Sequence, residues 1–132
     1  MEPTLDDLLQ PWHDALGRDR GAYENHVRRI LALCESVAAA AAVPASDEVR
    51  HAWLVAAAFH DLGIWSAGTW DYLDPSVALA QAWLTEHEQD ELVPLVTRMI
   101  REHHGLRPRG PATDPVEIFR RADVVDLSLI HI

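Results

Sequence analysis

The sequence predicts an all-α protein, a bundle of about five to six helices, on the basis of three observations. Apolar residues recur at helical spacing along most of the 132-residue chain, and no segment shows the strict alternation of a half-buried strand. The dipeptide Asp-Pro occurs at 74–75 and at 114–115, where it is typical of a helix start. The hydrophobic content is 48%, and the length suits one domain over residues 1–132.

The N-terminal third is expected to form two helices. Residues 4–17 form a short amphipathic segment that ends near Gly17, and its apolar positions are Leu5, Leu8, Leu9, Trp12 and Leu16. The second helix is expected over about residues 21–42, with an apolar stripe made of Val27, Ile30, Leu31, Cys34, Val37 and Ala41. Because His26 stands one turn before Ile30, we expect its side chain to border the buried face.

The third helix is expected to begin at Ser46 or Asp47, either of which can cap its N-terminus. Its inward stripe consists of Val49, Trp53, Ala56 and His60. The helix leads into the sequence VAAAFHDLG at residues 55–63, where small apolar residues precede the adjacent pair His60 and Asp61. The glycine that ends this sequence is predicted to stop the helix, which places the pair in its last turn.

Residues 63–73 are expected to form a loop, because they contain two glycines and break the helical pattern. The loop carries three large aromatic side chains, Trp65, Trp70 and Tyr72. Two interpretations stay open for the tryptophans. Either they line a pocket and stack on a flat part of a substrate, or they close the core over a long connection.

Three more helices are expected over residues 74–87, 91–104 and 114–132, the second of them starting at Pro94 if that proline takes the first helical position. Asp74 is expected to cap the first of the three. A loop rich in glycine and proline separates the last two. The chain ends in LSLIHI without a capping residue, so we expect a truncated chain whose missing part would complete the core.

Composition and charge narrow the class of protein. The formal net charge of −10 disfavours binding to a nucleic-acid backbone, which requires clustered basic side chains. No apolar run approaches the roughly 18 residues of a membrane span, and the acidic N-terminus lacks the layout of a signal peptide. We therefore expect a cytoplasmic protein. Its single cysteine, Cys34, cannot form an internal disulfide and is expected to be a buried thiol.

The polar residues on the inward faces are candidates for a metal site, because imidazole nitrogens and carboxylate oxygens bind divalent ions. In chain order they are His26, His60, Asp61, His103 with His104 beside it, and Asp123. Asp123 shares a stripe with Val116 and Phe119, where a carboxylate costs several kcal/mol unless it is paired or metal-bound. Asp126, three residues later, is the competing choice.

This order of residues resembles the HD superfamily of metal-dependent phosphohydrolases. Members carry a histidine, a later adjacent His-Asp pair and a distant aspartate on separate helices of a bundle, and AAAFHDLG is the most specific match. The resemblance covers about residues 20–130. It implies one divalent ion (Mn, Co, Ni, Zn, Mg or Fe) with the ligands His26, His60, Asp61 and Asp123. For the second ion of some members, it suggests His103, His104 and Asp74.

The resemblance also implies hydrolysis of a small phosphate ester, which we expect to be a nucleotide. A metal-activated water would attack the phosphorus atom, with Asp61 as both metal ligand and partner of that water. Arg29 and Arg107 are candidates to hold the phosphate, because guanidinium groups bind phosphate oxygens well. Trp65 or Trp70 would contact the rest of the substrate.

Other functions remain open at this point. The HD superfamily also includes hydratases of small nitriles or cyanamide and di-iron oxygenases, and the tryptophan-rich loop suits an apolar substrate. A non-catalytic helical module with a structural metal is the third alternative. A homodimer is a further expectation, because the apolar residues Leu5, Leu8 and Trp12 are able to cover a second subunit.

Overall fold

The computed structural model describes residues 3–103 and 110–130, and all regular elements in these ranges are helical. The longer helices are α3 (Arg20–Ala40), α4 (Asp47–Phe59), α6 (Leu73–Glu86), α7 (Val93–Glu102) and α8 (Pro115–Ile130). The short helical turns are α1 (Leu5–Leu9), η1 (Gln10–Trp12), α2 (His13–Leu16), η2 (Gly17–Asp19), α5 (Gly63–Ser66) and η3 (Asp90–Leu92). The prediction of an all-α bundle of about five to six helices is confirmed.

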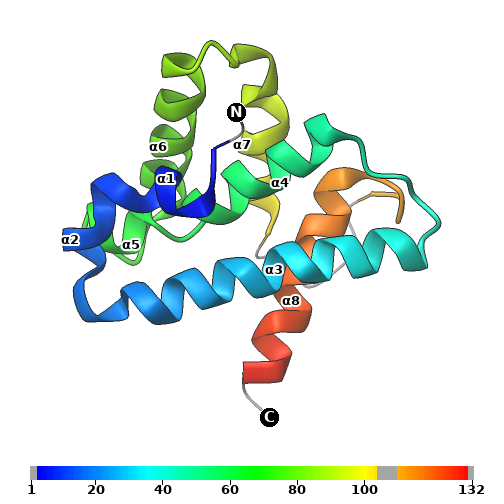
Figure 1. The fold of residues 1–132 in the computed structure, drawn as a ribbon, viewed down its shortest axis with the longest axis horizontal. Helices are drawn as coiled ribbons and strands as arrows, with labels where there is room; N and C mark the ends of the chain where they lie inside the picture. Colours follow the sequence, from blue (N-terminus) through cyan, green and yellow to red (C-terminus); the bar gives the residue numbers. More distant parts are fainter. Residues whose placement is uncertain (1–2, 104–109, 131–132) are drawn as a thin grey trace.

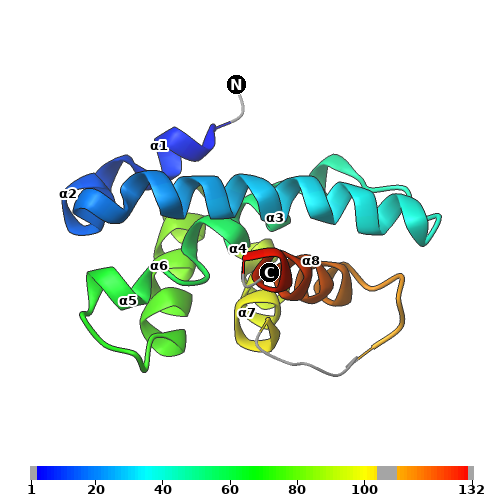
Figure 2. The same cartoon turned by 90° about the horizontal axis from the view of Figure 1, so that it is seen from below.

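The longest helix, α3, extends along the molecule, and α8 packs against it at a steep angle (Figure 1). Figure 2 shows α8 nearly along its axis, beside α7 and against α3. Helix α4 is central because it packs against α1, α3, α6 and α7. The second half of α4 is therefore buried on every side, which explains why it consists of small and aromatic apolar residues.

The core takes side chains from all the longer helices. Its largest fully buried members include Trp53, Phe59, Leu84, Met99, Ile100 and Phe119. Burial of one such side chain contributes about 1.5–3 kcal/mol to stability. Cys34 is fully buried, as predicted, and burial raises the pKa of its thiol. Within the described residues, the helices lack the combination of length and apolar composition that a membrane crossing requires.

The predicted helix over residues 4–17 is instead broken into α1, η1 and α2. Pro11 lies at the start of the 3-10 turn η1, where its missing N–H and fixed backbone angle interrupt the α-helical hydrogen bonds. The apolar positions predicted for this segment nevertheless face the core, since Leu5 and Leu8 are buried. Trp12 packs edge-on against Phe59, with ring centroids 5.5 Å apart. Leu5 and Leu8 therefore cover the core of their own chain, and the homodimer stays a prediction without this support.

The predicted caps have different outcomes. Ser46 caps α4 by accepting a hydrogen bond from the Val49 N–H at 3.1 Å, and Asp114 Oδ1 accepts one from Val116 N at 2.9 Å. The prediction that Asp74 caps α6 is wrong, because the helix begins one residue earlier, after Tyr72. The backbone N–H of Ser76 donates to the carbonyl oxygen of Tyr72 and not to the Asp74 side chain.

Candidate metal centre

The end of α4 fixes the orientation of the His60 ring. The last carbonyl groups of a helix have no partners inside the helix, so side chains often supply them. His60 Nδ1 donates to the Ala57 carbonyl at 2.7 Å, and the Tyr23 hydroxyl donates to the Ala58 carbonyl at 2.7 Å. Because a carbonyl only accepts, Nδ1 carries the proton in this contact, and Nε2 of the fully buried ring points into the core.

Gly63 has a different role from the one predicted. Helix α4 ends at Phe59, so His60 and Asp61 lie in the turn after the helix, and Gly63 begins α5. A Cβ atom at Gly63 would lie 2.5 Å from the Tyr72 carbonyl oxygen and 2.8 Å from Ser76 Oγ. The Gly63 N–H donates to Ser76 Oγ at 2.9 Å. A glycine is therefore needed for close packing of the His-Asp turn against the start of α6.

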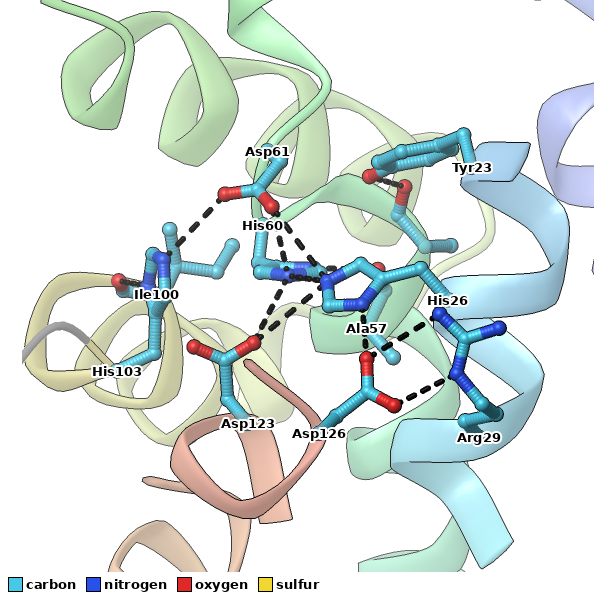
Figure 3. Close-up of polar contacts among 11 residues, drawn as sticks. Tyr23, His26, Arg29, Ala57, His60, Asp61, Ile100, His103, Asp123 and Asp126 are labelled. Atoms are coloured by element: carbon cyan, nitrogen blue, oxygen red, sulfur yellow. Dashed lines mark hydrogen bonds and ion pairs between the residues drawn. The ribbon is translucent and has the colours of Figure 1, made fainter. Parts of the chain in front are cut away.

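Side chains from α3, α8 and the turn after α4 meet at one point in the core (Figure 3). The Nε2 atoms of His26 and His60 lie 3.2 Å apart. Asp61 Oδ2 lies 3.1 Å from His60 Nε2 and 3.6 Å from His26 Nε2. Asp123 Oδ1 lies 3.6 Å from each of these nitrogens. In Figure 3 the two carboxylates approach the pair of histidines from opposite sides.

These distances suit ligands of a divalent ion. An ion bonded to nitrogen and oxygen atoms at about 2.0–2.2 Å keeps neighbouring ligand atoms about 2.8–3.6 Å apart, from octahedral to tetrahedral geometry. Five pairs of the potential ligand atoms described above lie 3.1–3.6 Å apart, and those of His26, His60 and Asp123 all lie within 4.8 Å of one another. The exposed fraction is 0% for the His60 side chain, 3% for Asp123 and 12% for His26. The fold thus brings together the predicted ligands His26, His60, Asp61 and Asp123.

His103 lies beside this group, as predicted from its inward stripe. It follows α7 directly and is buried, and its Nδ1 donates to the carbonyl oxygen of Ile100. Its Nε2 lies 3.4 Å from Asp61 Oδ1, the carboxylate oxygen that faces away from His26 and His60. His60, Asp61 and His103 form a second set of potential ligand atoms within 4.8 Å of one another. Asp61 therefore has one carboxylate oxygen near His26 and His60 and the other near His103.

Asp126, the alternative to Asp123, contacts the opposite side of the His26 ring. Its Oδ2 lies 2.5 Å from His26 Nδ1, and its Oδ1 accepts a hydrogen bond from Arg29 Nε at 2.6 Å. The set of potential ligands around the two histidines therefore includes Asp123 and not Asp126. Arg29, predicted to hold a phosphate, has Asp126 as its partner, and 45% of its side chain is exposed.

The electrostatics show how the centre keeps its charge balance. Burial lowers the pKa of His60, but the carboxylates of Asp61 and Asp123 outweigh burial and raise this pKa well above its ordinary value. Burial raises the pKa of Asp61, but His60, His103 and His26 outweigh it and hold this pKa well below the ordinary value. The carboxylates thus favour positive charge on the His60 ring, as they would favour a cation at the same place.

Aromatic side chains surround the more open side of the centre. Asp61 has 22% of its side chain exposed and is the most accessible of the four potential ligands. Burial raises the pKa of Tyr72, and so do the charge of Asp61 and a side-chain hydrogen bond to it. Trp65 packs edge-on against Tyr23 at 5.1 Å, and Tyr23 stacks on His60 at 6.3 Å.

Two other predicted site residues, Trp70 and Asp74, are not part of this centre. Trp70 is 82% exposed, so it does not close the core. The prediction of Asp74 as a second-site ligand is wrong, because its side chain is 80% exposed and pairs with Arg101 at 2.9 Å. His104 and Arg107 lie outside the described residues.

Another potential set of ligands, Asp6, His13 and Glu24, lies near the start of α3. Arg20 Nε donates to Glu24 Oε1 at 3.3 Å, and Arg20 Nη2 lies 3.9 Å from Asp6 Oδ1. Glu24 also has Arg28 Nη1 at 4.0 Å. Guanidinium groups already supply the positive charge here, so we interpret this set as ion pairs that join the N-terminal turns to α3.

Two residues near the centre were not among the predicted site residues: Tyr23 and Tyr72. Asp126 was predicted only as the alternative to Asp123, not as a contact of His26. Tyr23 precedes His26 by three positions, so helical spacing alone indicated that the two share a face of α3. Tyr72 had no comparable signal, because its position depends on how the segment between α5 and α6 folds back.

Comparison with known proteins does not add a family to this geometry. No family model, no curated protein and no solved structure matches the chain. The resemblance to the HD superfamily therefore stays a prediction from the sequence, and a function must be inferred from the residues of the centre themselves.

Proposed function

We propose that the protein is a metal-dependent hydrolase in which His26, His60, Asp61 and Asp123 bind a divalent ion. The main support is that the two imidazole nitrogens lie 3.2 Å apart and that one oxygen of each carboxylate lies 3.1–3.6 Å from both nitrogens in the core. Buried carboxylates cost several kcal/mol unless positive charge compensates them. A divalent ion provides that charge and uses the nitrogen and oxygen atoms as ligands.

The proposed reaction is hydrolysis of a small phosphate ester, with a nucleotide as the expected substrate. When bound, a divalent ion makes water a nucleophile near neutral pH and offsets negative charge on a phosphoryl group. We assign to Asp61 the role of orienting the attacking water, because its side chain is the most accessible of the four potential ligands. His103 holds the other carboxylate oxygen of Asp61 at 3.4 Å and limits its rotation.

The aromatic side chains near the centre are assigned to the non-phosphate part of the substrate. Trp65 is half-buried, and its indole N–H donates to Asp19 Oδ2 at 3.0 Å, which holds the ring in place. A held aromatic ring offers a flat apolar face at little entropic cost. Trp65 is therefore a better candidate than the exposed Trp70 for contact with a base or another flat group.

A second candidate function comes from the position of His103. The set His60, Asp61 and His103 offers a further place for an ion on the other side of Asp61. Two ions in one centre suit a dinuclear phosphodiesterase or a di-iron oxygenase, and a nitrile or cyanamide hydratase stays open as another HD-type enzyme. Two irons per chain together with oxygen uptake would favour the oxygenase. Hydration of a nitrile without phosphate release would favour the hydratase.

The test of the proposed reaction is phosphate release from a panel of nucleotides by protein loaded with Mn²⁺ or Co²⁺. Asp61→Ala is expected to lower kcat by at least about 100-fold, the usual scale for loss of a positioned acid or base. Asp74→Ala is the matched control, because it removes an exposed aspartate that pairs with Arg101, and it should keep full activity.

Full activity of the Asp61→Ala variant would contradict the assignment of Asp61. No phosphate release from any substrate, in wild-type protein shown to contain the ion, would contradict the phosphohydrolase. Loss of the fold on chelation of that ion would then favour the non-catalytic metal-binding module.

A further inference from the structure

We propose that Asp126 and Arg29 are positioning residues that fix His26 as a metal ligand through its Nε2 atom. This inference rests on the proposed metal centre. It adds a role for two side chains that are not members of the potential ligand sets.

The histidines of the centre are held in two different ways. His60 and His103 follow the last residue of a helix, and each donates Nδ1–H to a backbone carbonyl three residues earlier. His26 lies within α3, where the backbone carbonyls are engaged in the helix. Its ring therefore needs an acceptor from another part of the chain.

Asp126 is that acceptor. It comes from α8, its side chain is fully buried, and its Oδ2 lies 2.5 Å from His26 Nδ1. An ionised carboxylate only accepts hydrogen bonds, so this contact places a proton on Nδ1 and leaves the lone pair of Nε2 facing His60. Metal-binding histidines in general use such an outer carboxylate to fix the tautomer and the ring orientation.

Arg29 holds Asp126 in turn. It lies three residues after His26 on α3, so both side chains point toward α8. Arg29 Nε lies 2.6 Å from Asp126 Oδ1, and Arg29 Nη2 lies 3.5 Å from Asp126 Oδ2. The forked guanidinium thus contacts both carboxylate oxygens, which fixes the carboxylate plane relative to the His26 ring.

The pair also connects the formation of the centre to the packing of two helices. Asp123 and Asp126 are three residues apart on α8, so they lie on neighbouring positions of one helix face. One contributes to the potential ligand set, and the other contacts His26 and Arg29 on α3. Packing of α8 against α3 therefore places Asp123 in the potential ligand set and, through Asp126, orients His26.

The test is calorimetric titration of Co²⁺ into metal-free wild type and four variants. Asp126→Asn is expected to raise the Kd by about 10–100-fold, the usual effect of losing an outer contact of a ligand. Arg29→Ala should raise the Kd by a smaller factor, because Arg29 acts through Asp126. Arg29 is half exposed, so this variant keeps the test available if Asp126→Asn does not fold.

Two matched controls change a carboxylate or a guanidinium group that has no part in the contact between Asp126, Arg29 and His26. Glu117→Gln changes another buried carboxylate of α8, one that pairs with Arg120 at 2.6 Å instead of with His26. Arg28→Ala removes the neighbouring exposed arginine, whose partner is Glu24 at 4.0 Å. Both controls should bind Co²⁺ with the Kd of the wild type.

A second readout distinguishes positioning from general stability. The ¹⁵N resonances of the His26 ring in metal-free protein should show a proton on Nδ1 in the wild type and in Glu117→Gln, and a change in Asp126→Asn. If the wild type binds no Co²⁺, the metal centre itself is wrong. If the wild type binds Co²⁺ while Asp126→Asn and Arg29→Ala keep its Kd and its His26 resonances, the positioning role is overturned and the metal centre stands.

Discussion

The ends of α4 and α6 share one kind of histidine contact in different surroundings. Each helix is followed by a histidine, His60 or His87, whose Nδ1 lies 2.7 Å from a carbonyl oxygen of the preceding turn. His60 is fully buried between Asp61 and Asp123, whereas His87 is exposed and stacks on Trp83 with ring centroids 3.9 Å apart. The capping contact orients a histidine ring. Burial beside carboxylates makes such a ring a potential ligand.

The largest expected effect is that of replacing His60 with alanine, compared with the same replacement of His87. His60→Ala should weaken binding of a divalent ion by more than about 100-fold, beyond the range for loss of an outer contact. His87→Ala removes the same kind of capping contact and should leave the affinity unchanged. Calorimetric titration of both variants with Mn²⁺ or Co²⁺ measures the difference. Equal affinities in the two variants would contradict the assignment of His60.

The next effect concerns the close packing that follows His60 and Asp61. Gly63→Ala places a Cβ atom 2.5 Å from the Tyr72 carbonyl oxygen, so it should destabilise the fold by about 1–3 kcal/mol. Gly21→Ala is the control, because a Cβ atom there meets no neighbour within 4 Å. Thermal unfolding should show a lower Tm for Gly63→Ala and a Tm equal to or above wild type for Gly21→Ala. An unchanged Tm for Gly63→Ala would mean that the turn is not tightly packed.

The dependence of metal binding on pH tests the electrostatic part of the comparison. The raised pKa of His60 means that its proton stabilises the metal-free fold below the pKa of the unfolded chain, roughly 6.5. This stabilisation is lost as pH rises through the folded-state pKa. An ion needs the unprotonated ring, so its affinity should rise over that window by up to about tenfold per pH unit.

The expected result is a larger increase in Tm on adding Mn²⁺ at about pH 8 than at about pH 6, measured by differential scanning fluorimetry. The exposed His87 belongs to none of the potential ligand sets among the described residues, so His87→Ala should keep the same dependence. An increase in Tm that is equal at both pH values would contradict proton competition at His60.

The smallest expected effect is at the end of α7, where His103 is also buried and also contacts a carbonyl of its own helix. Its Nε2 lies 3.4 Å from Asp61 Oδ1, and its ring packs edge-on against His60 with ring centroids 5.0 Å apart. His103→Ala should therefore weaken the first ion by about tenfold, the lower end for an outer contact, and abolish any second ion. Elemental analysis together with titration separates the two effects. A loss as large as that of His60→Ala would make His103 a primary ligand.

The sequence predicted the faces of the longer helices well because apolar periodicity determines which side of a helix is buried. The buried positions of α3 and α4 and the inward orientation of His60 and His103 follow from this rule. The rule also placed Asp123 in the core. It does not distinguish Asp123 from Asp126, because residues three positions apart share a helix face and the crossing of α3 and α8 decides which contacts which histidine.

The errors concern contacts between segments that are distant in sequence. Gly63 had the pattern of a helix stop, yet the carbonyl of Tyr72 and the hydroxyl of Ser76 explain the glycine. Asp74 had the pattern of a cap, yet Tyr72 supplies the hydrogen-bond acceptor. In both cases the fold between α5 and α6 decides the outcome, and local pattern rules do not include such contacts.

The most direct test of the proposed centre is the metal content per chain, measured by elemental mass spectrometry on protein purified without chelator and soaked in Mn²⁺ or Co²⁺. At least one ion per chain is expected in the wild type and in His87→Ala, with none in His60→Ala. Absence of metal from the wild type after soaking would contradict the centre. So would equal metal content in His60→Ala and His87→Ala.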